Sequence, residues 1–206
     1  MKKWVHPVSL RILSELKSKP MSVNALSSRI ASKSGRPTYE TVRSLVNLLV
    51  KTGILTEKTE GRKRLISLAE ENLVARNLIA LSEAIRFTDA VSSANHGLAK
   101  AAYSLIELLE ENCPDVKLDL YFYGSFAEGH AKPTSDVDVV VVAPPAKIGA
   151  LREKIGKIER VHAEIVDHLT FSAMEARGEP VIASALIGGI HLQLPLFKHR
   201  RPLLKG

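Results

Sequence analysis

The sequence predicts an α+β protein that is built from two differently charged parts. Over residues 8–51, apolar residues recur at intervals of three and four, which is typical of helices. Residues 117–195 instead contain short β-type segments that are separated by turns. Residues 1–70 hold 14 basic and 5 acidic side chains, whereas residues 71–206 hold 15 basic and 17 acidic ones. This asymmetry favours two modules with different partners.

The composition excludes several classes of protein. Hydrophobic residues make up 45% of the chain and charged residues 25%, which is ordinary for a globular protein and excludes a disordered chain. No apolar run approaches the roughly 20 residues of a membrane span, and the first ten residues lack the apolar core of a signal peptide. The single cysteine, Cys113, excludes an internal disulfide and a zinc site built from cysteines. We therefore expect a soluble, cytoplasmic protein without a membrane partner.

The first seventy residues predict three helices followed by a β-hairpin. Apolar residues at helical spacing begin after Pro7. Ser22 and Thr38 are candidate N-caps of the second and third helices, and Gly53 ends the third. The segment 54–68 then consists of two short apolar stretches around a polar, glycine-containing tip, which indicates a hairpin.

Three helices followed by a basic hairpin resemble the winged helix-turn-helix family. The most specific stretch is NLLVKTGILTEKTEGRKRLISL, a helix end followed by a wing. In this family the third helix enters the major groove of duplex DNA and the hairpin tip contacts the DNA backbone. The net charge of +9 over residues 1–70 suits such a polyanion. Winged helices also serve as protein-docking or dimerisation modules, and that alternative stays open. The resemblance assigns DNA contacts to Arg36, Thr38, Tyr39, Arg43, Arg62, Lys63 and Arg64.

Residues 71–113 predict one or two long helices, because they contain no proline and no cluster of turn residues. We interpret them as a helical connector between a winged helix domain at 1–70 and a second domain at 114–206. A dimerisation helix, and with it a homodimer, is the alternative, because winged helices usually bind paired half-sites. The apolar stripe of this segment consists of Leu98, Ala102, Leu105 and Leu109.

The C-terminal part places two aspartates at the start of a buried strand. Residues 117–124 predict a strand that ends in Gly124-Ser125, and a loop then leads to Asp136, Asp138 and four valines. Because alternate residues of a strand share a face, the two aspartates are expected to lie together. Paired carboxylates suit Mg²⁺, with the phosphates of a nucleotide completing its coordination. Gly124 lets phosphates approach the backbone, and Ser125 offers a hydroxyl and an N–H.

This arrangement resembles the nucleotidyltransferase superfamily, which includes DNA polymerase beta, the CCA-adding enzymes and the aminoglycoside nucleotidyltransferases. In size it is similar to the minimal archaeal and bacterial members, and the resemblance covers about residues 115–195. It implies a mixed sheet with helices on one face. It also implies transfer of a nucleoside monophosphate from ATP or another nucleoside triphosphate, with two Mg²⁺ ions. The resemblance assigns nucleotide binding to Gly124, Ser125, Gly129 and Ser135, and metal binding and catalysis to Asp136 and Asp138.

The family also uses a third carboxylate on a neighbouring strand, and the segment 160–171 offers Glu164 and Asp167. Strand alternation puts Glu164 on a mostly polar face and Asp167 on a mostly apolar one. We choose Glu164 as the third catalytic and metal-binding carboxylate, although the family often has Asp there. The histidines do not show the spacing of metal ligands. We expect them to lie on the surface or beside the site: His130, His162, His168 and His191.

The sequence therefore predicts an active nucleotidyltransferase that is joined to a DNA-binding domain. A protein hydroxyl is one candidate acceptor, because small members of the family are often paired with a protein that they modify. The alternative is a transcriptional regulator whose transferase domain senses nucleotide without turnover, and a third hypothesis is a protein-binding scaffold. The intact pair of Asp136 and Asp138 favours the enzyme over the sensor. The basic N-terminal part favours both of these over the scaffold.

Overall fold

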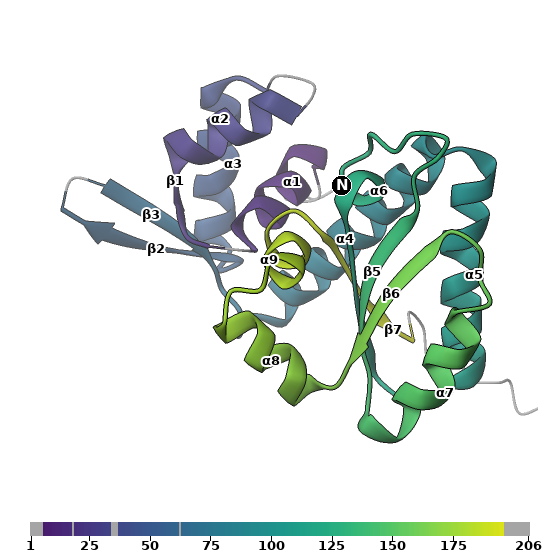
Figure 1. Cartoon of the computed structure of the whole chain (residues 1–206). Helices are drawn as coiled ribbons and strands as arrows, with labels where there is room; N and C mark the ends of the chain where they lie inside the picture. Colours follow the sequence, from purple (N-terminus) through teal and green to yellow (C-terminus); the bar gives the residue numbers. More distant parts are fainter. Residues whose placement is uncertain (1–5, 18, 34–36, 62, 196–206) are drawn as a thin grey trace, which may run out of the picture. The chain divides into compact units, whose positions relative to one another are not determined.

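The chain folds into two compact units, residues 1–84 and 85–206, and each has its own hydrophobic core (Figure 1). Helix α4, Leu73–Ser93, begins in the first unit and ends in the second. The predicted boundaries after residues 70 and 113 differ from this division. The reason is that the start of α4 packs in the first core, whereas the next helix packs in the second. The computed structural model describes residues 6–17, 19–33, 37–61 and 63–195.

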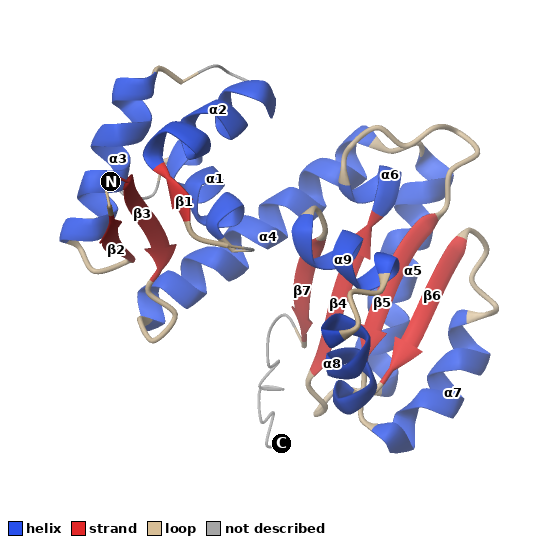
Figure 2. Cartoon of the chain, turned by 60° about the vertical axis from the view of Figure 1, so that its left-hand side comes forward, coloured by secondary structure: helices blue, strands red, loops and turns tan. Residues whose placement is uncertain are grey.

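The first unit combines three helices and the start of α4 with a small antiparallel sheet (Figure 2). Thr38 caps the third helix as predicted, since its Oγ1 accepts a hydrogen bond of 3.2 Å from the N–H of Thr41. Ser22 accepts a hydrogen bond of the same length from the N–H of Ala25. The elements are α1 Pro7–Leu16, β1 Met21–Ser22, α2 Val23–Lys33, α3 Tyr39–Lys51, β2 Leu55–Glu60 and β3 Lys63–Leu68, with the strands in the order β1-β3-β2.

The hairpin of β2 and β3 follows the prediction, but the sequence did not predict β1. This strand has two residues, which is too short to show a pattern, and Met21 pairs with Ile66 of β3. The sheet packs on the helices through side chains that α3 directs inward, among them Val42, Val46 and Leu49.

The second unit contains a four-stranded mixed sheet in the order β6-β5-β4-β7. Strands β5 and β6 are parallel, whereas β4 is antiparallel to both of its neighbours, β5 and β7. The strands are β4 Leu118–Tyr123, β5 Val137–Val142, β6 Val161–Val166 and β7 Ile190–Leu194. The helices after α4 are α5 His96–Asn112, α6 Gly124–Ala127, α7 Pro145–Ile155, α8 His168–Ala176 and α9 Pro180–Ile187.

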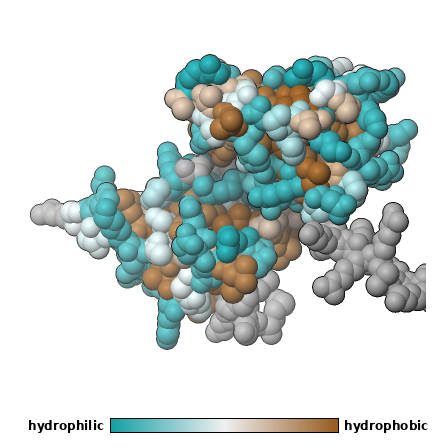
Figure 3. Space-filling view, turned by 90° about the horizontal axis from the view of Figure 1, so that it is seen from below, coloured by the Kyte–Doolittle hydropathy of each residue, from teal (hydrophilic) through white to brown (hydrophobic). Residues whose placement is uncertain are grey.

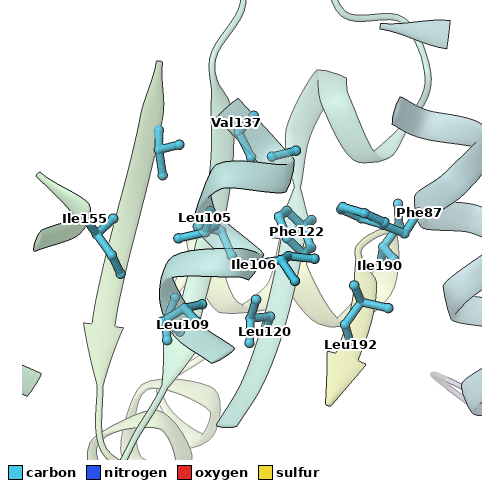
Figure 4. Close-up of a cluster of buried hydrophobic side chains, with 14 of the residues drawn as sticks. Phe87, Leu105, Ile106, Leu109, Leu120, Phe122, Val137, Ile155, Ile190 and Leu192 are labelled. Atoms are coloured by element: carbon cyan, nitrogen blue, oxygen red, sulfur yellow. The ribbon is translucent and has the colours of Figure 1, made fainter. Parts of the chain in front are cut away.

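One face of this sheet is covered by α5 and α7 and forms the main core. Leu105 and Leu109 of α5 lie against Leu120 and Phe122 of β4 (Figure 4). The predicted apolar stripe of α5 is therefore confirmed, since all four of its residues are buried. The break between α4 and α5 falls at Ala94–Asn95, where Asn95 caps α5.

Helices also cover part of the opposite face, so the prediction of helices on one face was wrong. Phe171 of α8 and Ile182 of α9 pack against Val140, Val142 and Val166. The physical reason is the run of valines, which gives β5 apolar side chains on both faces of the sheet. Both faces are therefore more stable when helices bury them. The rest of this second face, which carries Asp138 of β5 and the exposed His162 and Glu164 of β6, is called the open face.

Apolar side chains that remain exposed in the second unit include Tyr103, Leu169 and Ile187. Figure 3 shows hydrophobic and hydrophilic residues side by side on the face that it presents, which is ordinary for a folded protein. Among the helices that the described residues form, none combines the length and the apolar character of a membrane span.

A buried carboxylate links β4 to the edge strand β7. Asp119 accepts hydrogen bonds of 2.9 Å from Nε2 of His191 and from Nε2 of Gln193. Burial raises the pKa of Asp119, but these hydrogen bonds outweigh burial and hold it below the ordinary carboxyl value. Tyr121 stacks on His191 with the ring centres 4.4 Å apart. Burial raises the pKa of Tyr121 to about 12.

We expect Asp119 to stabilise the second unit at neutral pH and to lose this effect in acid. Because its folded pKa is depressed, its contribution is fully present above the unfolded carboxyl pKa of about 3.9 and is lost as the pH falls through the folded pKa. Urea unfolding of the wild type and of Asp119→Asn should therefore give free energies that differ most at neutral pH and converge in acid. A difference that is the same at every pH would contradict this role.

Candidate active site

A turn at the end of β4 brings the backbone against a carboxylate. Gly124 has a φ of +67°, and a Cβ at this position would lie 2.9 Å from Oδ2 of Asp138. The left-handed backbone favours glycine here, and an added Cβ would also force the Asp138 carboxylate to shift. Phe126 and Ala127 of the following turn, α6, are buried and anchor it in the core.

The loop between α6 and β5 is closed by two serines. The hydroxyl of Ser125 donates to Oγ of Ser135 at 3.2 Å, and this Oγ also accepts from the N–H of Lys132 at 2.9 Å. Gly129 has a φ of +75°, with open space where a Cβ would stand. The structure thus brings Gly124, Ser125 and Ser135 together, whereas Gly129 shapes the turn between them.

Two aspartates converge at the start of β5. Oδ2 of Asp136 lies 3.8 Å from Nε2 of His162, and Oδ1 of Asp138 lies 3.8 Å from Nδ1 of the same ring. Because both carboxylates contact one imidazole, they are close neighbours. Burial raises the pKa of Asp138; His162 opposes this shift, and the charge of Asp136 adds to it. The pair is thus a concentrated negative charge that a cation would relieve.

His162 takes this place because of the pairing between β5 and β6. In the parallel register, Asp138 lies opposite His162, and Val140 lies opposite the next polar residue, Glu164. The His162 side chain is 71% exposed. Spacing along the chain gave no sign of this contact, since the register between two strands is needed to see it.

Glu164 lies on the open face with Asp138, and it is exposed. Burial raises the pKa of Tyr123, and the charges of Asp138 and Glu164 raise it further. Asp167 follows the strand and caps α8, with Oδ1 accepting a 2.8 Å hydrogen bond from the N–H of Thr170. Among the residues that the structure describes, no three His, Cys, Asp or Glu side chains lie close enough together to hold a metal ion by themselves.

Arg160 fastens the loop that precedes Asp136. Its guanidinium donates to the carbonyls of Pro133, at 2.8 Å, and of Ser135, and its Nε lies 4.0 Å from Oδ1 of Asp136. Nη1 also donates at 3.1 Å to Oδ1 of Asn95. Arg160 has a φ of +65°, which is uncommon for a residue other than glycine. The sequence did not point to Arg160, because an arginine between a helix and a strand carries no distinguishing pattern.

Among the residues with predicted DNA contacts, those that the structure describes lie at the start of α3, on α3 and on the β2–β3 hairpin. Tyr39 and Arg43 are exposed on α3, whereas Thr38 uses its hydroxyl as the cap described above. On the hairpin, Lys63 is exposed, and Arg64 donates to Glu57 at 2.7 Å and to Asn47 at 2.8 Å. Outside the described residues lie Arg36 and Arg62.

Comparison with known families adds an independent observation. Residues 104–189 match the family model described as a nucleotidyltransferase domain. This match supports the nucleotidyltransferase superfamily. It runs from the middle of α5 to just beyond α9 and contains the Gly124 turn, the aspartate pair and Glu164. Comparisons with curated proteins and with solved structures gave no match.

The close approach of Gly124 to Asp138 has a measurable consequence. Gly124→Ala and Gly129→Ala both force a left-handed backbone on alanine, a strain of about 1–2 kcal/mol, but only the first also meets a carboxylate. We expect Gly124→Ala to lower the free energy of unfolding by about 1 kcal/mol or more beyond the matched control. Equal losses in urea unfolding would show that the carboxylate moves away at no cost.

Proposed function

We propose that the second unit transfers a nucleoside monophosphate from ATP or another nucleoside triphosphate to a hydroxyl acceptor. The match to the nucleotidyltransferase domain supports nucleotidyl transfer in general. The observation that carries the proposal is the convergence of Asp136 and Asp138 beside the Gly124 turn. A tight turn that begins with glycine, next to two carboxylates that can share a cation with phosphates, suits a metal-bound triphosphate.

The residues present fit a divalent cation that is shared with the nucleotide. Carboxylate oxygens are hard ligands, and Mg²⁺ usually takes one or two of them together with phosphate oxygens and water. Asp136 and Asp138 would supply the carboxylates, and the repulsion between them would fall when a cation binds. When bound, one or two Mg²⁺ ions would neutralise the charge of the phosphates and of the leaving pyrophosphate.

The residues of the loop would hold the triphosphate. Gly124 would let phosphates approach the backbone of the turn without a Cβ, and the linked hydroxyls of Ser125 and Ser135 would fix the loop around them. Arg160 would keep Asp136 in position, because its guanidinium donates hydrogen bonds to the backbone carbonyls of the residues that precede Asp136. Gly129 would act through the shape of the turn.

In the transfer step, the acceptor oxygen attacks the α-phosphorus. The bond between this phosphorus and the oxygen bridging to the β-phosphate breaks, and pyrophosphate leaves with the bonding electrons. We assign the proton of the acceptor hydroxyl to the carboxylate of Glu164, which is exposed on the same open face. Coordination of a metal by Glu164 once nucleotide is bound is the alternative role, and the hydroxyl of a protein side chain is the acceptor that we propose.

Substitution of the three carboxylates separates these roles. Asp136→Asn with Asp138→Asn should weaken Mg²⁺·ATP binding about tenfold or more, because charge-assisted contacts to the metal are lost. Glu164→Gln should bind nucleotide normally and lose about 10²–10⁴ in transfer rate. Isothermal calorimetry with and without EDTA measures binding, and release of pyrophosphate measures transfer.

Asp167→Asn is the matched control, since asparagine also caps helices and this variant should behave nearly as the wild type. If Asp167→Asn abolishes transfer while Glu164→Gln is mild, the third carboxylate is Asp167. If the Asp136/Asp138 variant binds Mg²⁺·ATP as the wild type does, the site assignment is wrong.

We further propose that the first unit is a winged helix that binds duplex DNA. Three helices, a hairpin and a surplus of basic residues support this, and Arg43 and Lys63 are exposed on the two elements concerned. Lys63 would contact phosphates from the hairpin, and Tyr39 and Arg43 would contact the major groove from α3. Arg36, Arg62 and Arg64 would add phosphate contacts. Arg64 would do so by breaking its hydrogen bond to Glu57 and donating to a phosphate of the DNA instead.

Salt dependence tests the DNA contacts. Each phosphate that the protein neutralises contributes about 0.9 to the slope of log K against log salt, so Lys63→Ala should reduce the slope by about that amount. Lys157→Ala, an exposed lysine of the second unit, is the control with the same charge change. Fluorescence anisotropy with a duplex measures both, and a complex that is insensitive to salt would exclude this mode.

The second candidate function is a DNA-binding regulator that senses nucleotide without turnover. The presence of a basic unit next to the nucleotidyltransferase segment favours it. Nucleotide binding that changes DNA affinity, without release of pyrophosphate under any acceptor condition, would indicate this function instead.

A further inference from the structure

The outer edge of β6 lies beside the candidate site and has no strand partner. In the order β6-β5-β4-β7, β6 is the last strand on its side (Figure 2). Its pairing with β5 uses the carbonyls of Arg160 and Val166, which accept from the N–H groups of Val137 and Ala143. In a parallel ladder, alternate residues turn to the same side. The N–H and C=O of residues 161, 163 and 165 therefore point away from the sheet.

This edge is closed at one end and open at the other. Nη2 of Arg152 donates to the carbonyl of Ile165 at 3.2 Å. This hydrogen bond occupies the edge at the end of β6 that is far from the aspartates. Within the described part of the chain, no hydrogen bond uses the outward groups of Val161 or Ala163. The unused groups thus lie at the end of β6 that carries His162, next to Asp136 and Asp138.

A groove of about 390 Å³ runs along the same edge. The end of α7 forms one wall with Ile155 and Gly156, and Tyr123 and Glu164 line it from the open face. A volume of this size is in the range of binding pockets, about 300–1,000 Å³. The groove therefore combines unpaired backbone groups, a wall from α7 that includes Arg152, and the proposed proton acceptor.

We propose that this edge binds an extended segment of an acceptor protein, which adds to the sheet as a further strand beside β6. The proposal rests on the transfer to a protein hydroxyl described above. Unpaired N–H and C=O groups in a row match the backbone of an extended polypeptide, whereas a small-molecule alcohol has no such row. Side chains directly opposite each other on neighbouring strands have their Cβ atoms about 4.5–5.5 Å apart. A Ser, Thr or Tyr of the added strand opposite His162 or Glu164 would thus place its hydroxyl at the site.

Ala163→Pro tests the edge directly. Proline removes the outward N–H of residue 163 but leaves the bonds of Arg160, His162 and Glu164 to β5, so the sheet is retained. Ala163→Val keeps the N–H and suits a strand, so it is the matched control. The probe is a library of ten-residue peptides, each with one central Ser, Thr or Tyr, incubated with Mg²⁺ and ATP that is labelled at the α-phosphate.

The wild type and Ala163→Val should label peptides at similar rates, and Ala163→Pro should label them about tenfold more slowly. Calorimetry should give similar Mg²⁺·ATP affinities for all three proteins. Absence of nucleotide binding by the wild type would overturn the proposed function itself. Release of pyrophosphate in the presence of another acceptor but no labelling of peptides, or equal labelling by Ala163→Pro, would overturn only the edge proposal. Nucleotide binding without transfer to any acceptor would overturn the proposed function.

Amide hydrogen exchange gives a second measurement that does not depend on the proline variant. A saturating concentration of a peptide that the wild type labels should slow exchange of the Ala163 N–H in the wild type. Exchange of the Glu164 N–H should stay unchanged, because this N–H already bonds to β5. Unchanged exchange at Ala163 would overturn the proposal. So would a dimer of the wild type that Ala163→Pro converts to monomer with peptide labelling intact, since the edge would then pair two copies of the chain.

Discussion

The parallel register of β5 and β6 is the constraint on which the candidate site depends. It places Asp138 opposite His162 and Val140 opposite Glu164, so the polar side chains of two strands meet on one face. Because side chains alternate, a slip of one residue would turn Glu164 into the core and Ala163 toward the aspartates. The apolar residues of the two strands, packed against α5 and α7 on one side and α8 and α9 on the other, make that slip costly.

Negative charge is concentrated on this face, and the Arg160 guanidinium offsets part of it. Arg160 and His162 lie next to Asp136, and His162 reaches Asp138 as well. Arg160 also ties the loop carbonyls to the cap of α5, so it joins the electrostatics of the site to the packing of the helix layer. The guanidinium that compensates charge is therefore also the group that sets the position of the loop.

Local patterns in the sequence were sufficient for much of the second unit. The aspartates lead a buried strand as the valine run indicated, and alternation alone placed Glu164 on the polar face. Asp167 was assigned to a strand face, but it lies just beyond the strand and caps α8, since a cap and a strand end look alike in sequence. The sequence did not point to Arg160, and it placed His162 on the surface or beside the site without its contacts to the two aspartates, because such contacts depend on which strands are neighbours. The sequence also did not predict that α8 and α9 cover part of the second face. A run of valines shows that both faces of β5 are apolar, but it does not identify the helices that pack on each face.

The position of β7 determines the order in which this sheet can be completed. β4 is an inner strand, but Leu118 and Phe122 find their partners in Leu194 and Ile190, roughly 70 residues later in the chain. During synthesis at about 5–20 residues per second, β4 therefore waits several seconds for its second neighbour. The Gly124 turn, the loop and β5 follow β4 directly, so the carboxylate pair is assembled from local contacts while one side of β4 is still unpaired. The newly made chain can thus form the candidate site's turn and strands β4 and β5 before β7 completes the pairing of β4.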